Sequence, residues 1–248
     1  MSGRAGGSRP AGARDEREAA GWVRSMFARV VPRYDLLNHL LSFQLDRWWR
    51  ARTVRRVRRI LRRPGARVMD LCCGTGDLTL ALEAERGGPV IGSDFCHPML
   101  LAAQRKTARK RYSSVLVECD ALCLPVPDRS LDLVTTAFGF RNLTSYRNGL
   151  AEMRRVLKPG GRAAILEFSQ PENRVWAALY GFYSRRVLPA VGGAISGDAD
   201  AYRYLPDSVR QFPSAAELAA EMGRAGFDPV EYERLSGGIV VLHLGTAP

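Results

Sequence analysis

From Ala66 onward, short apolar runs alternate with segments whose apolar residues recur every three or four positions. The short runs predict β-strands, and the periodic segments predict amphipathic α-helices. The predicted strands are 67–72, 89–94, 114–119, 131–138 and 161–168, and the predicted helices are 77–85, 98–110, 145–157 and 214–225. This alternation favours an α/β fold with a Rossmann-like, doubly wound, mostly parallel sheet that binds ligands beyond the carboxyl ends of its strands.

The carboxyl-terminal part departs from this alternation in two places. Val230–Leu235 and Ile239–Leu244 flank two glycines and predict an antiparallel hairpin. Residues 169–213 are aromatic and glycine-rich, and an insertion after the fifth strand overhangs the ligand edge of such a sheet, as a lid or an acceptor site would. Lys158–Gly161 predicts a helix stop and a turn before that strand. We assign 66–248 to one ligand-binding domain.

Two segments precede this domain. Residues 1–20 are rich in Gly, Arg and Ala and predict a disordered tail, whereas 21–65 predict a basic helical segment. Within 48–61, apolar residues fall near one helix face and arginines cover the rest. Such a helix either packs on the domain with solvated arginines, or contacts nucleic acid, or lies on a membrane surface through Trp48, Trp49 and Ile60.

Charge and composition narrow these alternatives only in part. Residues 1–67 carry 17 arginines against five acidic residues, so this part holds the whole net charge of +12. No apolar run is long enough to span a membrane, and the first twenty residues lack the apolar core of a secretory signal. The five cysteines lack zinc-binding spacings, and the three histidines form no ligand set, so we expect reduced thiols and no metal.

The stretch from Val68 to Asp77 predicts the site of a nucleoside-containing cofactor. An apolar strand ends at Asp70, and the chain then turns through Gly74 and Gly76 into a helix. The third glycine of the dinucleotide pattern is replaced by Thr79, and Asp77 would repel a pyrophosphate at the helix start. S-adenosylmethionine, a nucleoside joined to an amino acid through a cationic sulfonium, meets neither objection.

Acidic residues at successive strand ends support this choice of cofactor. Asp94 ends the second predicted strand and can accept hydrogen bonds from both ribose hydroxyls. Asp120 ends the third, where it or Ala121 can meet the adenine edge, and Asp70 can face the ligand's ammonium group. Each aspartate alone is explained as a cap or turn former, but three beside one glycine turn indicate a binding site.

With those positions placed, the chain resembles class I methyltransferases, and among them the demethylmenaquinone/ubiquinone C-methyltransferases. The resemblance extends from about Phe27 to Leu244. It rests on the glycine turn and on the runs Arg33–Asn38, Phe138–Asn142, Arg155–Gly161, Gly197–Leu205 and Ser208–Arg210. It implies cofactor contacts at Thr75, Asp94, Asp120 and Ala121, with Ala137 standing where some relatives have a serine near the methionine moiety. Gly74 and Gly76 are predicted to bind the cofactor as part of the glycine turn.

The resemblance also implies the reaction, which is methylation of a ring carbon in a reduced, prenylated naphthoquinol. Arg141 is predicted to stabilise the oxyanion of that ring, although a structural salt bridge is the competing role. Asn142 would orient the quinol or support Arg141, Tyr34 would relay the proton, and Asp198 or Asp200 would receive it. The predicted substrate contacts are Tyr202, Tyr204 and Arg210.

Several alternatives stay open at this point. A benzoquinol of the ubiquinone pathway needs the same chemistry as the naphthoquinol. The arginine-rich amino terminus also suits an RNA methyltransferase, although we expect no nucleic-acid partner, and a regulator that binds the cofactor without catalysis is a third alternative. For a quinol enzyme we expect a cytoplasmic protein, peripheral on an anionic inner membrane face, with homodimer formation left open.

Overall fold

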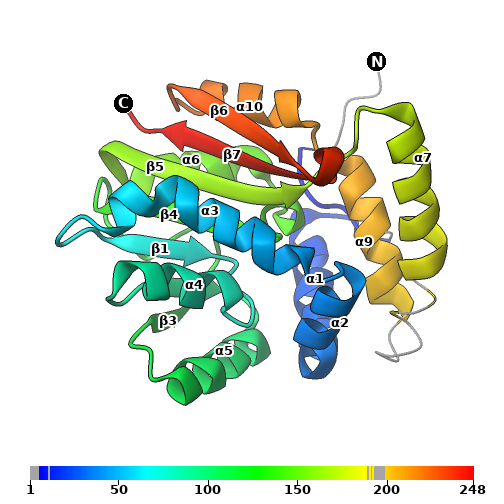
Figure 1. The fold of residues 1–248 in the computed structure, drawn as a ribbon, viewed down its shortest axis with the longest axis horizontal. Coiled ribbons are helices and arrows are strands. Elements are labelled where there is room, and N and C mark those ends of the chain that lie inside the picture. The colour runs from blue at the N-terminus through cyan, green and yellow to red at the C-terminus, as the bar shows by residue number, and fades with distance from the viewer. Residues whose placement is uncertain (1–5, 11, 189, 191, 193–198) are drawn as a thin grey trace.

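A seven-stranded sheet forms the centre of the protein in the computed structural model, which describes residues 6–10, 12–188, 190, 192 and 199–248 (Figure 1). The strand order is β3-β2-β1-β4-β5-β7-β6. The first five strands pair in parallel, and β7 runs antiparallel to both β5 and β6. The strands are β1 (Val68–Leu71), β2 (Ile91–Asp94), β3 (Val115–Glu118), β4 (Leu131–Ala137), β5 (Leu157–Phe168), β6 (Val230–Leu235) and β7 (Val240–Thr246). The predicted fold class is confirmed.

Helices cover both faces of the sheet, each with its own core. The helices are α1 (Glu16–Val30), α2 (Tyr34–Leu41), α3 (Leu45–Leu61), α4 (Asp77–Arg86), α5 (His97–Lys110), α6 (Tyr146–Val156), α7 (Arg174–Phe182), α9 (Ala199–Gln211) and α10 (Ala215–Arg224). One core joins α3 and α4 to the sheet, and the other joins α6 and α10 to its opposite face. Figure 1 shows α3 and α4 in front of the sheet and α6 and α10 behind it. None of the described helices is both long and apolar enough to cross a bilayer.

Helix α3 packs on the domain, which is the first of the three alternatives that the sequence left open for this segment. Trp49 and Ile60 are buried in the core, so the prediction that they contact a membrane is wrong. Their apolar face has the sheet as its partner. Some arginines of α3 also have acidic partners, since Arg52 donates to Glu233 at 2.8 Å and Arg58 donates to Glu85 at 2.9 Å.

The amino-terminal tail is more ordered than its composition suggested. Helix α1 begins at Glu16, where the Asp15 side chain accepts a hydrogen bond from the Glu18 amide and caps the first turn. Ser8 is buried, and its amide donates to the Leu143 carbonyl at 2.7 Å. The prediction of a disordered tail is therefore wrong for Ser8 and for the residues from Glu16 onward, because caps and backbone partners hold them in place.

Two further differences concern the fifth strand and the insertion. Lys158–Gly161 lies inside β5 rather than in a turn before it, and the register between β4 and β5 shifts between Leu131 and Leu133. Gly160 takes a positive φ of 76°, so the turn-forming sequence makes an irregularity within the strand. The insertion contains α7, a π-helical turn over Tyr183–Val187, and α9.

Candidate active site

A first cavity lies beyond the carboxyl ends of β1, β2 and β4. It is lined by Asp70, Gly74, Thr75, Asp94, Asp120, Ala121, Ala137 and Asn142, all predicted site residues. Gly76 does not line the cavity and acts on the shape of the turn instead. Because parallel strands bring their carboxyl ends to one edge, residues far apart in sequence meet here.

The two glycines allow the turn to pass between the cavity and the neighbouring helix. Gly74 has a φ of 55° and Gly76 has a φ of 87°, both in the left-handed region that side chains disfavour. A Cβ on Gly76 would also lie 3.3 Å from the Cβ of Ala103 on α5. Gly76 is the N-cap of α4, so the turn delivers the chain directly into that helix.

Asp94 is held in one orientation by backbone donors. Its carboxylate accepts hydrogen bonds from the Gly74 amide at 2.8 Å and from the Cys96 amide at 2.9 Å. Burial is the larger influence and raises the pKa of Asp94 to about 6. Each carboxylate oxygen keeps a lone pair for a further donor. The geometry suits acceptance of ligand hydroxyls at the end of β2.

Asp70 is buried beneath the same turn. Thr79 and Thr135 each donate to one of its carboxylate oxygens at 2.7 Å. Burial raises the pKa of Asp70 to about 6, because it disfavours the charged form more than the two hydroxyls favour it. A cationic ligand in the first cavity would stabilise the buried carboxylate and so oppose the effect of burial on the pKa of Asp70.

The raised pKa values predict how cofactor affinity depends on pH. In the free protein, Asp70 and Asp94 take up protons as the pH falls through about 6. Binding of a cationic cofactor favours the ionised carboxylates, so affinity should be constant above that pH. Below it, affinity should fall by about tenfold per pH unit for each carboxyl that must ionise. Calorimetric titration with S-adenosylmethionine at several pH values measures this affinity. Asp70→Asn should make its dependence on pH shallower. Equal affinity above and below pH 6 in the unmodified protein would contradict the prediction.

A second cavity, larger than the first and largely apolar, adjoins it. Four residues line both cavities: Phe27, Tyr34, Arg50 and Phe138. The insertion contributes much of the remaining wall, including Tyr180, Tyr183 and Tyr204. A cavity that holds several aspartates and a more strongly apolar cavity therefore share one wall, where groups bound in the two can meet.

Arg141 lines the second cavity and makes a buried ion pair. Its Nη1 donates to Glu167 Oε1 at 2.9 Å and also to the Phe138 carbonyl, and its Nε donates to Ser208 Oγ at 3.3 Å. Its Nη2 donates to no described residue. The salt bridge expected as the competing role is thus present, and one guanidinium nitrogen remains available to a ligand in the cavity.

The polar side chains of the second cavity are linked to the amino terminus. The Tyr204 hydroxyl donates to Asn142 Oδ1 at 3.0 Å and lies 2.8 Å from Ser8 Oγ. Asn142 lines the first cavity and Tyr204 the second, so this chain of hydrogen bonds connects them. Burial raises the pKa of Tyr34, which lines both, so its hydroxyl stays protonated at neutral pH.

Not every predicted residue reaches the site. Arg210 is exposed on α9 and pairs with Asp207, and it lines neither cavity. Its pairing within one helical turn explains its outward position. Asp198 lies outside the described residues, as do the side chains of Asp200 and Tyr202, although the last two belong to α9 by backbone.

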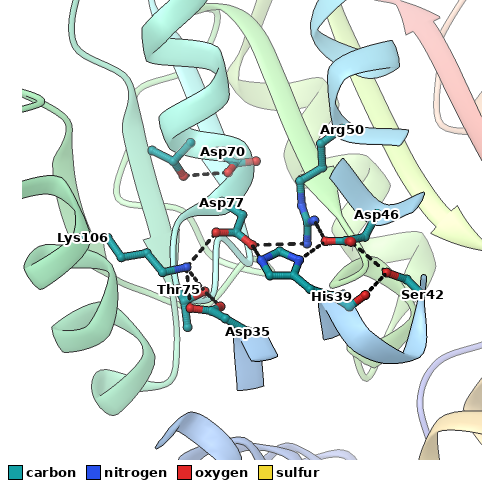
Figure 2. Close-up of polar contacts among 10 residues, drawn as sticks. Asp35, His39, Ser42, Asp46, Arg50, Asp70, Thr75, Asp77 and Lys106 are labelled. Atoms are coloured by element: carbon teal, nitrogen blue, oxygen red, sulfur yellow. Dashed lines mark hydrogen bonds and ion pairs between the residues drawn. The ribbon is translucent and has the colours of Figure 1, made fainter. Parts of the chain in front are cut away.

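A network of charged residues, which the sequence did not reveal, closes one side of the glycine turn (Figure 2). Lys106 donates to Asp77 at 2.7 Å and to Thr75 at 3.0 Å, and its ammonium lies 2.6 Å from Asp35. The Thr75 hydroxyl donates to Asp35 at 2.5 Å. Asp77, predicted to repel a pyrophosphate, is thus paired with a lysine from α5.

The network continues from α2 to α3. His39 Nδ1 lies 2.7 Å from Asp46 Oδ2, and Arg50 donates to the same carboxylate at 2.5 Å. Ligand atoms of His39, Asp46 and Asp77 lie within 4.8 Å of one another. Each carboxylate already has a cationic partner, so we assign an ion-pair network that holds α2 against the turn, and no metal site.

Comparison with known proteins decides the family. The family model described as the ubiE/COQ5 methyltransferase family matches residues 12–247. The chain belongs to this family. The demethylmenaquinone methyltransferase of Thermus thermophilus is 48% identical over 224 residues, which cover 90% of this chain and all of that protein. The ubiquinone/menaquinone biosynthesis C-methyltransferase UbiE of Burkholderia mallei is 44% identical over 237 residues, 94% of this chain and 95% of that protein.

Solved structures support the fold of an S-adenosylmethionine-dependent methyltransferase. One such enzyme from Thermotoga maritima aligns with a TM-score of 0.63 and 18% identity, covering 90% of this chain and 99% of that one. The cyclase SpnF aligns with a TM-score of 0.69 and 17% identity, covering 92% and 97%. At these identities the likeness establishes the architecture alone. The family establishes the chain as a methyltransferase, and the lining of the first cavity fits its cofactor.

Proposed function

We propose that this protein transfers a methyl group from S-adenosylmethionine to a ring carbon of demethylmenaquinol. The observation that carries the proposal is the wall shared by two cavities, of which only the first is lined by several aspartates. The first is lined by Asp70, Asp94 and Asp120, which suits a cationic nucleoside cofactor, and the second is large and apolar, which suits a lipid quinol. The names of the relatives from Thermus and Burkholderia support the quinone acceptor.

The lining of the first cavity supports the proposed cofactor contacts. Asp94, fixed by its two backbone donors, would accept the ribose hydroxyls, and Asp70 would face the ammonium group. Asp120 and Ala121 line the cavity beyond β3 and would meet the adenine edge, while Ala137 lies at the end of β4. When bound, S-adenosylmethionine supplies the electrophilic methyl group.

The second cavity supplies what the acceptor needs. A ring carbon becomes nucleophilic when a neighbouring hydroxyl loses its proton, so a positive charge near the resulting oxyanion lowers the barrier. Arg141 and Arg50 both line this cavity, and neither gives up its own proton at neutral pH. Arg141 Nη2 would donate to the oxyanion, and the apolar walls exclude water that competes for the methyl group.

Tyr34 and Asn142 complete the proposed constellation. The Tyr34 hydroxyl lies at the shared wall and, with its pKa raised by burial, would pass a proton on rather than keep a negative charge. Asn142 holds Tyr204 by a hydrogen bond and would orient the ring. Asp198 and Asp200 remain the proposed proton acceptors, on the basis of the sequence resemblance. Arg210 lines neither cavity, so we assign it no role in the proposed site.

The acceptor test compares two ring systems. Reduced demethylmenaquinol should be methylated with a kcat/KM at least about tenfold above that of the corresponding demethylated benzoquinol, since the apolar cavity favours the larger fused ring. The Burkholderia relative's name covers both pathways, so a benzoquinol is the second candidate acceptor. Turnover of the benzoquinol alone would replace the proposed substrate, and turnover of neither would refute the function.

The lipid acceptor sets the proposed location. A prenylated quinol resides in the bilayer, so the enzyme must reach the membrane surface to collect it. We place the protein on the inner face of the cell membrane as a peripheral protein. The basic amino-terminal part adds electrostatic attraction to anionic lipids.

A further inference from the structure

Helix α7 is unusual because none of its nine residues is buried. Its sequence, Arg174 to Phe182, is nevertheless mostly apolar. Trp176, Leu179 and Tyr180 line the second cavity from one side of this helix. Val175 (70% exposed) and Phe182 (63% exposed) lie seven residues apart on another side, with Leu179 between them. Exposed apolar side chains at this spacing form a continuous stripe along a helix.

A second apolar stripe lies on α2 and on the turn that follows it. Leu36 and Leu40 are exposed on α2, and Phe43, 72% exposed, lies two residues beyond the end of this helix. The inward side of this helix buries Leu37 instead. Soluble proteins seldom expose contiguous apolar groups of this kind unless the surface meets a partner.

The two stripes flank the mouth of the second cavity. Phe43 and Leu179 both line that cavity and are largely exposed, so they lie at its opening. The rings of Phe43 and Tyr183 are 5.8 Å apart, which brings the end of α2 against the π-helical turn after α7. Figure 1 places α2 and α7 on the same side of the molecule, with β3 on the opposite side. We call Leu36, Leu40, Phe43, Val175, Leu179 and Phe182 the apolar rim.

Positive charge accompanies the apolar rim. Residues 174–188 contain three arginines and no acidic residue. Those arginines, Arg174, Arg185 and Arg186, are exposed, as is Arg47 at the start of α3. None of the four forms an ion pair with a described residue, in contrast to the paired arginines farther along α3. Exposed apolar groups beside exposed arginines match the acyl boundary and headgroups of an anionic bilayer.

We propose that the apolar rim docks on an anionic lipid bilayer and turns the mouth of the second cavity towards the membrane. The prenyl chain would then stay among the acyl chains while the ring enters the cavity. This inference rests on the proposed function, and it places the docking surface on α2 and α7 instead of on the buried face of α3. We favour a bilayer over a second copy of the chain as the partner of the rim, because a second copy would cover the opening through which a lipid substrate must enter.

The test uses the full-length protein and vesicles of phosphatidylcholine with or without phosphatidylglycerol. Val175→Ser combined with Phe182→Ser, and separately Leu36→Ser combined with Leu40→Ser, should each lower vesicle partitioning by roughly tenfold or more. None of these four residues lines either of the two cavities of the proposed site, so turnover of a short-chain quinol in solution should be unchanged. Arg185→Gln with Arg186→Gln should weaken binding only to the vesicles that contain phosphatidylglycerol.

The matched control replaces exposed apolar residues outside the apolar rim, on α5 and β3. Leu101→Ser with Val115→Ser, at 41% and 54% exposure, should leave vesicle partitioning unchanged. Equal losses in the control and rim variants, or wild-type partitioning of the rim variants, would overturn the docking surface. A rim-dependent dimer in sedimentation that does not bind vesicles would also overturn it. If the unmodified protein methylates no soluble quinol, the proposed function is refuted instead of the docking surface.

Discussion

Arg141→Lys should lower kcat by about a hundredfold to a thousandfold, because the lysine loses the planar set of donors that would stabilise the ring oxyanion. The wild-type guanidinium uses Nη1 for Glu167 and Nε for Ser208, and Nη2 remains for the substrate. Lysine keeps a positive charge opposite Glu167 but cannot serve all these partners at once. Steady-state rates with saturating quinol and cofactor measure the effect.

Cofactor binding provides the control for this variant. Arg141 does not line the first cavity, so the Kd for S-adenosylmethionine should stay near that of the unmodified protein. Arg141→Ala should lose at least as much turnover. If both variants keep their turnover, Arg141 has no part in the chemistry and only the structural ion pair remains.

Glu167→Gln should lower the free energy of unfolding by about 3–5 kcal/mol, since it leaves the Arg141 guanidinium buried without its counter-ion. Glu167 Oε1 also accepts the Phe168 amide at 2.9 Å, and Oε2 accepts the Arg141 amide at 3.1 Å. The glutamine side chain has one carbonyl oxygen where the carboxylate had two, so one set of bonds is lost as well. Denaturant unfolding followed by circular dichroism measures the change.

An exposed glutamate gives the matched comparison. Glu172 also pairs with an arginine, Arg234, but its side chain is exposed to solvent. Glu172→Gln should therefore change the free energy of unfolding by less than about 1 kcal/mol. If the free energy of unfolding falls by a similar amount in the two variants, burial of the Arg141–Glu167 pair does not determine how much this pair contributes to stability.

The sequence predicted the sheet and the cofactor edge because both depend on local patterns. Alternating strands and helices require parallel pairing, which brings the ends of β1 and β2 together and with them Asp70 and Asp94. Positive φ at Gly74 and Gly76 follows from a turn that side chains disfavour. A salt bridge at Arg141 was one of the two roles that the sequence left open, but the sequence did not identify Glu167 as the partner of Arg141.

Other features depend on packing between distant segments, which periodicity does not specify. Arg50 belongs to the arginine-rich face of α3, yet it lines both cavities and pairs with Asp46, whereas Arg52 pairs with Glu233 on β6. Periodicity gives the face of a helix but not the element that covers it. The same reason explains why Trp49 is buried and why the link between Lys106 and Asp77 was not foreseen.

The position of the transferred methyl group tests the central claim most directly. The protein should be incubated with S-adenosylmethionine carrying a ¹³C-methyl group and with reduced demethylmenaquinol, and the product examined by nuclear magnetic resonance. Two cavities that meet at Tyr34, Arg50 and Phe138 predict one labelled methyl group on the ring carbon next to a hydroxyl. A label on a quinol oxygen, or no label on the quinol at all, would contradict C-methylation at this shared wall.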